Sequence, residues 1–450
     1  MRLSATETSV ASMQNARNLS DAGTADYASI RAWIWVYFIL LIFEGALRKW
    51  VFPSQSDLLL LVRDPIVIWI YFLAYSQNVF PTENKYLNRL YGWTILACVI
   101  SLIFNQTHPA VIAYGIHTNL LHFPLIFVIG QVLRWKDVIR FGYAILFLTL
   151  PMTFFCQEQF ESDRYDIMNI AAGGTGYQLE TSGGKVRASG TFSFVSGIVF
   201  FYCFAVAFII YGFLRLKTFN LLILVFSFGL TLTAMAIAGS RAVVAECLQV
   251  VACFGFLAYI RPREFGKITL FVFGLSAITI FLWTQIDIFM DGIDHLSKRF
   301  KEAENVEGHP IEAYFNRYWE MVSAPYYYNK FTDWLGNDGL GSGTRAGSEL
   351  ARRFGAGGLG GGAEISWARP IVENGLVIGS LFIFWRIWVA IDLLKACIRS
   401  IKRGNYLAIF LFGAAGPIIL FGLLGQPTNL GFAAFGGGLC LAAARARNFA

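Results

Sequence analysis

Charged residues are scarce in this sequence. Asp, Glu, Lys and Arg make up 14% of its 450 residues, whereas apolar residues make up 56% and the mean hydropathy is +0.55. A soluble domain carries about 25% charged residues. The shortage therefore excludes an ordinary soluble protein and predicts many membrane spans. We assign the net charge of +7 mostly to loops, where it reports membrane orientation, and expect no nucleic-acid partner.

Several well-known catalytic and metal-binding patterns are also missing. The sequence has no P-loop, no GxSxG and no HExxH, which argues against an ATPase, a serine hydrolase and a zinc protease. Its seven cysteines fall in or beside apolar runs and form no CxxC pair, so we interpret them as small buried hydrophobes. Asp287, Asp291 and Asp294 lie close in sequence, but their spacing fits neither an EF-hand loop nor a DxD pair. We expect no metal and no cofactor.

Long apolar runs dominate what remains. They predict an all-α, polytopic membrane protein of about twelve helices, because a bilayer needs about 20 apolar residues per spanning helix. The runs cover residues 32–47, 58–75, 89–104, 110–133, 138–156, 192–213, 218–238, 241–259, 267–286, 370–392, 406–424 and 429–444.

Lys and Arg concentrate in alternate connecting segments, and this asymmetry places both termini in the cytoplasm. Residues 1–30 are then a disordered cytoplasmic tail, and 31–286 hold transmembrane helices one to nine with an outside loop at 157–191. Residues 287–369 lie outside and are long enough to form a helical cap loop before the tenth span. Residues 370–450 hold the last three helices.

Polar residues inside these runs are costly and therefore informative. Glu44 and Arg48 are spaced i, i+4, which lets them pair on one helix face. Arg63 and Asp64 lie in the second run beside Pro65, which is able to kink it. We interpret both pairs as structural ion pairs rather than substrate contacts. The fourth run contains His117, Asn119 and His122, so it could hold a re-entrant piece.

Arg241 follows Gly239 and Ser240 at the junction between two apolar runs. One interpretation is a residue that extends its charge to the membrane surface. The other is an anion site facing an outside cavity, to which Ser240 and the N-terminus of the following helix would add N–H groups. The outside segments also carry Arg187, Arg317, Arg345, Arg352, Arg353 and Arg369. Arginines beside a membrane cavity suit a pyrophosphate, although Arg352 and Arg353 are better interpreted as solvated surface charges.

Four segments resemble motifs of the O-antigen ligase and O-antigen polymerase superfamily of bacterial membrane glycosyltransferases. RASGTFSFVSGIVFFY (187–202) is similar to its R-x-x-G-T-F element, and GSRAVVA (239–245) to its Ser-Arg-Gly/Ala element. The segment 316–343 resembles its outside-loop pattern of an Arg, a Trp and a Gly-x-Gly turn. PIVENGLVIGSLFIFW (370–385) resembles the E-x-G-x-x-G start of its tenth span. The order of the motifs, together with twelve spans and one large outside loop, carries the resemblance.

The resemblance implies a GT-C-type enzyme of the bacterial inner membrane. It would transfer or polymerise a glycan carried on undecaprenyl pyrophosphate, at the periplasmic face, onto a glycan acceptor and without a nucleotide sugar or metal. Arg241 and Arg317 match the family's pyrophosphate-binding positions, with help from Arg187 and Ser240. Membrane lipid and other polysaccharide-assembly proteins are the remaining partners implied.

One departure from the family concerns the catalytic base. The ligases carry a His about nine residues before the Glu that corresponds to Glu373, whereas this chain has Glu364 there. Glu364 is either the base or a loop residue, and His309 is a rival base. The missing His favours a polymerase of O-antigen or exopolysaccharide over a ligase. A transporter or flippase of lipid-linked oligosaccharide is the alternative function, and a receptor or scaffold has little in its favour.

Overall fold

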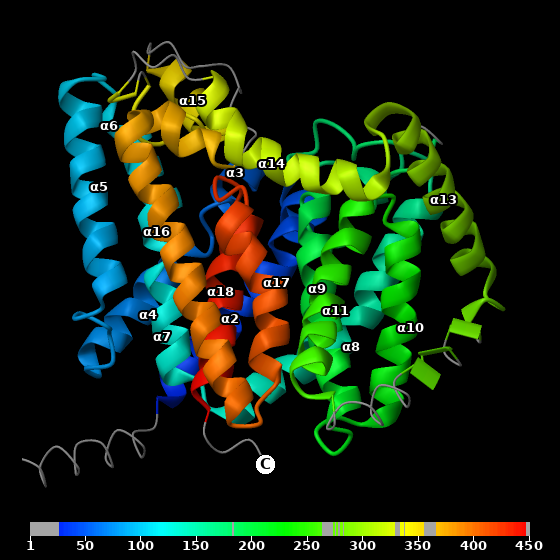
Figure 1. The fold of residues 1–450 in the computed structure, drawn as a ribbon. Helices are drawn as coiled ribbons and strands as arrows, with labels where there is room; N and C mark the ends of the chain where they lie inside the picture. Colours follow the sequence, from blue (N-terminus) through cyan, green and yellow to red (C-terminus); the bar gives the residue numbers. More distant parts are fainter. Residues whose placement is uncertain are drawn as a thin grey trace, which may run out of the picture.

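The computed structural model describes residues 27–181, 184–262, 273–274, 276–277, 280–281, 283–328, 334–336, 338–354 and 366–446. Helices are the only named regular elements in these ranges, and extended pairing is limited there to two isolated β-bridges (Figure 1). The predicted all-α class is thus confirmed. The elements are α2 (Ala28–Ala46), η1 (Leu47–Val51), η2 (Pro53–Gln55), α3 (Ser56–Leu59), α4 (Asp64–Ser76), α5 (Lys85–Ile103), α6 (Pro109–Ile116), η3 (His117–Leu121), α7 (Pro124–Val132), α8 (Trp135–Glu161), η4 (Ile167–Asn169), α9 (Val195–Leu214), α10 (Leu221–Ile237), α11 (Arg241–Ile260), α13 (Asp287–Glu307), α14 (Pro310–Tyr328), α15 (Arg345–Arg353), α16 (Ala368–Lys402), α17 (Leu407–Phe421) and α18 (Pro427–Arg445).

Eight helical stretches in the described ranges are long and apolar enough to cross a membrane. They are Ala28–Val51, Pro53–Ser76, Lys85–Ile103, Pro109–Val132, Trp135–Glu161, Val195–Leu214, Arg241–Ile260 and Ala368–Lys402. The helices α10 and α17 are apolar but shorter, at 17 and 15 residues. Most of the predicted ninth run, 267–286, falls outside the described residues. The chain is therefore a helical protein of membrane character.

The centre of the bundle is built from small and apolar residues. The helix α9 is apolar on every side and buried along most of its length, as expected for a helix with no solvent-facing stripe. The glycines of α18 allow neighbouring helices to approach closely: a Cβ at Gly436 would collide with the ring of Phe204, and one at Gly438 would lie 2.6 Å from the Cβ of Ile129. Small residues commonly serve this purpose between membrane helices.

The fourth apolar run forms one helical stretch that is interrupted at its centre. A π-helical turn, η3, joins α6 to α7, and Pro124 starts the second half. Side chains take up backbone carbonyls at the break: Asn119 Nδ2 donates to Gly115 O at 2.9 Å, and Tyr71 Oη donates to Leu121 O at 2.7 Å. Membrane helices tolerate such breaks where neighbouring groups satisfy the backbone. The polar residues thus mark a π-helical interruption within one candidate membrane-spanning stretch.

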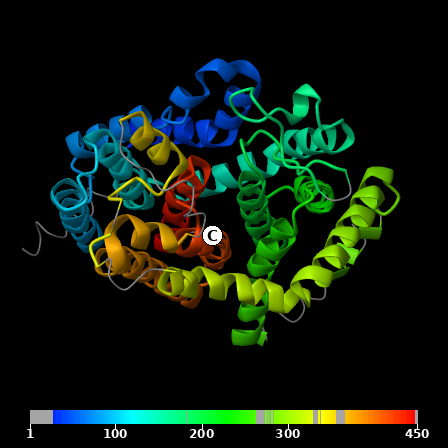
Figure 2. The ribbon, with the colours of Figure 1, turned by 90° about the horizontal axis from the view of Figure 1, so that it is seen from above.

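The helices α13, α14 and α15 lie together at one end of the bundle, and the two ends of the described chain lie at the opposite end (Figure 1). Seen from above, α13 and α14 follow one edge of the bundle and meet at a bend (Figure 2). The contacts of α13 are mainly with α10, and those of α14 with α16. The segment predicted to form a helical cap at 287–369 therefore does contain helices at one end of the protein.

The segment 157–191 closes the same end of the bundle beside α13. Gln159, a wholly buried residue, accepts hydrogen bonds from the backbone N–H groups of Ser189 and Gly190 at 2.9 and 2.8 Å. Lys49 donates to the carbonyl of Gly190 at 2.5 Å. These contacts fix the end of the segment from which Arg187 extends.

Candidate arginine site

Arg241 begins the helix α11. The preceding Gly239 has a φ of +60°, a conformation that glycine adopts without strain, and this turn separates α10 from α11. Ser240 is the N-cap residue, but its side chain makes no capping hydrogen bond. The guanidinium of Arg241 is 18% exposed and donates from Nη2 to Glu307 Oε1 at 2.7 Å. The side chain of Arg241 therefore points toward the bend between α13 and α14.

Glu307 is the last residue of α13 and binds a second arginine as well. Arg317 Nη2, from α14, lies 3.0 Å from both Oε1 and Oε2 of Glu307. The side chain of Glu307 is 33% exposed and that of Arg317 is 52% exposed. Two arginines that are 76 positions apart in the printed sequence thus meet on one partly exposed carboxylate. Sequence analysis predicted that Arg241 and Arg317 act together, and the structure brings them together.

Arg187 belongs to the same cluster. Its pKa is lowered by burial and by the positive charges of Arg299, Arg241 and Arg317, so all four guanidinium groups lie within electrostatic range. The Nε atom of Arg187 is buried and has no hydrogen-bond partner in the described part of the chain. Arg299, on α13, lies 3.7 Å from Glu302. We name Arg187, Arg241, Arg299 and Arg317 the arginine cluster.

Glu307 is held in its charged form by this cluster. The hydrogen bond from Arg241, reinforced by the charge of Arg317, lowers the pKa of Glu307 below its ordinary value. Its Oε1 is contacted by both Arg241 and Arg317, and its Oε2 by Arg317. The four arginines outnumber Glu307 and Glu302, so the cluster keeps a surplus of positive charge.

No protein-family model matches this chain, and no curated protein matches it. The resemblance to the O-antigen ligase and polymerase superfamily therefore depends on the sequence motifs alone. The first three motif segments supply Arg187, Arg241 and Arg317 to one cluster.

The fourth motif is structural in the described residues. Glu373 is wholly buried and accepts a hydrogen bond from the N–H of Gly343 at 3.1 Å, which joins α16 to the glycine-rich turn before α15. Gly375 interrupts α16 with a φ of +77°, and a Cβ there would collide with Trp334 O and Gly336 N. The E-x-G part of the motif thus docks the turn of the third motif onto the bundle.

Of the remaining arginines of the outside segments, Arg345 is exposed at the start of α15, and the other three divide into two kinds. Arg369 is 5% exposed and donates to Asn119 Oδ1 at 2.6 Å, so it is a buried structural residue and not a surface contact for substrate. Arg352 and Arg353 lie on the exposed face of α15 and pair with Glu349. Their interpretation as surface charges is confirmed.

The positions of the two proposed bases, Glu364 and His309, do not test a catalytic role for either of them. Glu364 lies outside the described residues. His309 is exposed at the start of α14, where its Nδ1 accepts a hydrogen bond from Ile311 N at 3.4 Å. A role as helix cap accounts for this geometry.

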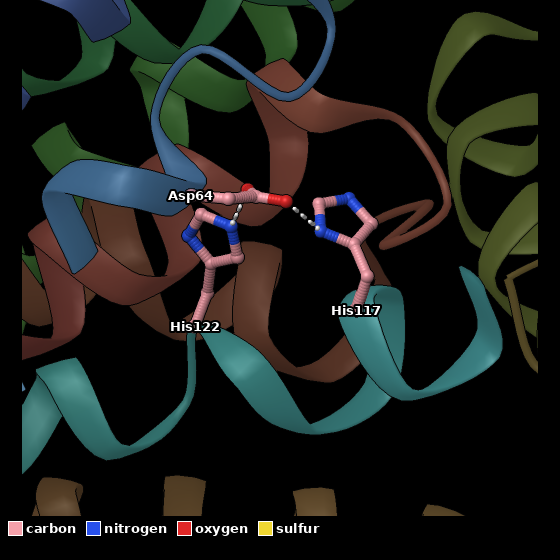
Figure 3. Close-up of side chains that lie close together, drawn as sticks. All are labelled: Asp64, His117 and His122. Atoms are coloured by element: carbon pink, nitrogen blue, oxygen red, sulfur yellow. Dashed lines mark hydrogen bonds and ion pairs between the residues drawn. The ribbon is translucent and has the colours of Figure 1, made fainter. Parts of the chain in front are cut away.

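A second polar group, absent from the sequence-based expectations, lies in the helical bundle. Asp64 at the start of α4 approaches His117, the first residue of η3, and His122, which directly follows η3: Oδ2 is 2.8 Å from His117 Nδ1, and Oδ1 is 3.1 Å from His122 Nε2 (Figure 3). The expected pairing of Arg63 with Asp64 is wrong, because Arg63 pairs with Glu44 at 2.8 Å. Pro65 lies in the first turn of α4, directly after the turn at 60–63 that interrupts the second apolar run between α3 and α4. The expected pair of Glu44 and Arg48 is present at 3.5 Å.

Proposed function

We propose that this protein is a membrane glycosyltransferase that transfers or polymerises a glycan carried on undecaprenyl pyrophosphate. In this proposal the chain crosses the bacterial inner membrane about twelve times, with both termini in the cytoplasm and the end bearing α13, α14 and α15 in the periplasm. Polymerisation of O-antigen or exopolysaccharide is favoured over ligation. The observation that carries the proposal is the meeting of Arg241 and Arg317 on the carboxylate of Glu307.

The cluster is chemically suited to a diphosphate. A guanidinium group presents a planar fork of N–H donors that matches two phosphate oxygens, and it stays charged at any physiological pH. Glu307 shows that Arg241 and Arg317 already converge on one anionic group with donor distances of 2.7 and 3.0 Å. A diphosphate brings more negative charge than one carboxylate, so it would compete with Glu307 for these donors.

Such an arrangement would lower the barrier to glycosyl transfer. As the bond from the sugar to the lipid diphosphate breaks, negative charge grows on the leaving oxygen. Guanidinium groups held in place before the reaction stabilise that charge more than they stabilise the intact donor, which is the requirement for catalysis. An acceptor hydroxyl would supply the new bond and lose its proton to a base. Glu364 remains the proposed base, with His309 as its rival.

Reconstitution with a synthetic undecaprenyl-pyrophosphate oligosaccharide tests this proposal. We expect the intact protein to produce longer chains and to release the carrier diphosphate, and we expect Arg241→Ala and Arg317→Ala to abolish both products. Arg353→Ala is a matched control, because Arg353 is an ion-paired arginine on α15 that is 65% exposed. Normal chain length in both cluster variants would end the proposal.

A transporter or flippase of the same lipid is the second candidate, and one observation favours it. Two membrane helices are interrupted: one at η3 and the other, α16, at Gly375. Interrupted helices with polar residues at the break are common at transporter binding sites. The reconstitution above separates the two functions. Movement of unchanged substrate to the other leaflet, without chain growth or release of carrier diphosphate, would favour transport.

A further inference from the structure

We propose that Asp64, His117 and His122 form a binding site for a divalent transition-metal ion of the zinc class, inside the helical bundle and separate from the arginine cluster. Each residue offers one ligand atom, and the three atoms lie within 4.8 Å of one another. Figure 3 shows the carboxylate of Asp64 between the two imidazole rings, with both rings rising from the neighbourhood of η3. This departs from our sequence-based expectation of a protein without metal.

The ligand set and its spacing fit zinc. Imidazole nitrogen and carboxylate oxygen are ligands that zinc prefers, with bond lengths of about 2.0–2.2 Å. In the tetrahedral geometry of zinc, two such ligand atoms lie about 3.3–3.6 Å apart. The separations of 2.8 and 3.1 Å between Asp64 and the histidine nitrogens are slightly shorter than this, and all three ligand atoms lie within 4.8 Å of one another. A small rotation of the side chains would bring all three ligands onto one ion.

The contact of His117 with Asp64 is an ion pair that leaves the hydrogen-bonding geometry of the ring unsatisfied. His117 is 9% exposed, and its Nδ1 atom lies 2.8 Å from Oδ2 of Asp64. This contact does not have hydrogen-bond geometry, so Nδ1 is a buried polar atom without a hydrogen-bond partner in the described residues. Buried polar atoms of this kind are rare in native proteins, and each one calls for an explanation. A bound metal ion would take up its lone pair.

His122 has the second contact that metal-binding histidines usually have. Its Nδ1 lies 3.1 Å from the hydroxyl of Tyr37, on the side of the ring away from Asp64. A hydrogen bond at the second nitrogen fixes the orientation and tautomer of the ring, so that Nε2 presents its lone pair to the ion. His122 is 2% exposed. Tyr37, which contacts its ring, belongs to α2, so α2 holds the ring in position.

The surrounding charges leave Asp64 available to a cation. The neighbouring Arg63 is 2% exposed and is paired with Glu44, and a second guanidinium nitrogen of Arg63 donates to Pro427 O at 2.6 Å. Two of the Arg63 nitrogens are therefore engaged by groups other than Asp64. The side chain of Asp64 is 16% exposed, which gives an ion a route to the site.

A metal ion at this position would add to the connection between α4 and the interrupted helix, which Tyr71 of α4 already contacts through Leu121 O. Asp64 begins α4, and the two histidines frame the break between α6 and α7. A break removes helical hydrogen bonds and so permits one half of the helix to move against the other. Coordination by His117 at the start of η3 and His122 just after its end would fix this turn relative to α4. The role we assign to the ion is therefore structural.

Metal counting on the full-length protein tests the site. The protein would carry a peptide tag without histidine, be stripped with a chelator in detergent and be equilibrated with Zn²⁺ before elemental analysis. We expect one Zn²⁺ per chain, and at least a tenfold loss of affinity in His117→Ala and Asp64→Asn. His309→Ala should bind normally, because His309 is exposed on α14. Equal uptake by the intact protein and His117→Ala, or no uptake at all, would overturn the proposal.

Two further measurements guard against misfolded variants. Asp64→Asn keeps the shape of the side chain, and Tyr37→Phe keeps all three ligands while removing the hydrogen bond to His122; the latter should weaken Zn²⁺ binding about tenfold or more. X-ray absorption of the loaded protein should show nitrogen and oxygen neighbours at about 2.0–2.2 Å. Arg241→Ala should bind Zn²⁺ normally, so the metal site and the proposed glycosyl transfer can fail separately.

Discussion

Replacing Glu307 by Gln should strengthen the binding of a diphosphate to the arginine cluster. In the structure Glu307 receives donors from Arg241 at 2.7 Å and from Arg317 at 3.0 Å. A diphosphate that takes its place must first break both contacts. The substitution keeps the size of the side chain and removes its negative charge, so it weakens the competitor without opening a void.

The size of the effect follows from the exposure of each pair. Fully exposed ion pairs contribute about 0.2–1 kcal/mol, and hydrogen bonds to charged groups contribute about 1.5–3 kcal/mol. The Arg241 side chain is 18% exposed, so we assign its contact with Glu307 about 1 kcal/mol; Arg317 is 52% exposed, so we discount its contact to about 0.5 kcal/mol. Losing both contacts would improve diphosphate affinity by about tenfold, because 1.4 kcal/mol corresponds to a factor of ten.

Titration of the purified protein with inorganic pyrophosphate, followed by calorimetry, measures this change. The effect should shrink as salt is raised, since these groups are partly exposed and therefore screened. Glu349→Gln is the matched control, because Glu349 also pairs with two arginines but lies on α15, outside the cluster. If Glu307→Gln binds pyrophosphate no better than the intact protein, the view that Glu307 occupies the diphosphate position is wrong.

Three other predictions concern pH, buried charge and packing. Because Arg241 lowers the pKa of Glu307, the carboxylate stays ionised above its unfolded pKa of about 4.3 and its pairing is lost only as pH falls through the lower folded value. The affinity gap between the intact protein and Glu307→Gln should therefore be equal at pH 7 and pH 6 and should close only in strong acid, as a pH series of the same titration would show. Glu44→Gln leaves the buried Arg63 uncompensated and should cost about 3–5 kcal/mol of stability, measured by unfolding in detergent; a loss below about 1 kcal/mol would contradict the pairing. Gly436→Leu should cost about 1–3 kcal/mol in the same assay, because the new side chain overlaps the ring of Phe204, and a neutral result would show that α18 can shift.

The helical class and the general membrane character could be predicted from the sequence because they depend on long apolar runs. The convergence of Arg241 and Arg317 could be predicted only through the resemblance, since no spacing rule links the start of α11 to the middle of α14. Their shared partner, Glu307, could not be predicted. It is one of many carboxylates in 287–369, and only the bend after α13 selects it.

The polar residues of the fourth run predicted the position of the helix interruption, but not the contact of its two histidines with Asp64. His117 and Asn119 do mark an interruption, because their polar side chains accompany freed backbone groups. The approach of Asp64 to both histidines depends on packing between α4 and η3, which are distant in sequence. Arg63 and Asp64 are adjacent in the chain, yet a helix start sends neighbouring side chains in different directions. Adjacent opposite charges were therefore a poor guide to pairing.

The burial of the seven native cysteines makes selective labelling of the bend between α13 and α14 possible. All seven are free, and each is buried or half-buried. Val306, by contrast, is 86% exposed and immediately precedes Glu307. A Val306→Cys variant would thus carry one fully solvated sulfhydryl that reacts with a maleimide dye ahead of the native ones, and the dye's emission would report the arrival of a lipid diphosphate in real time.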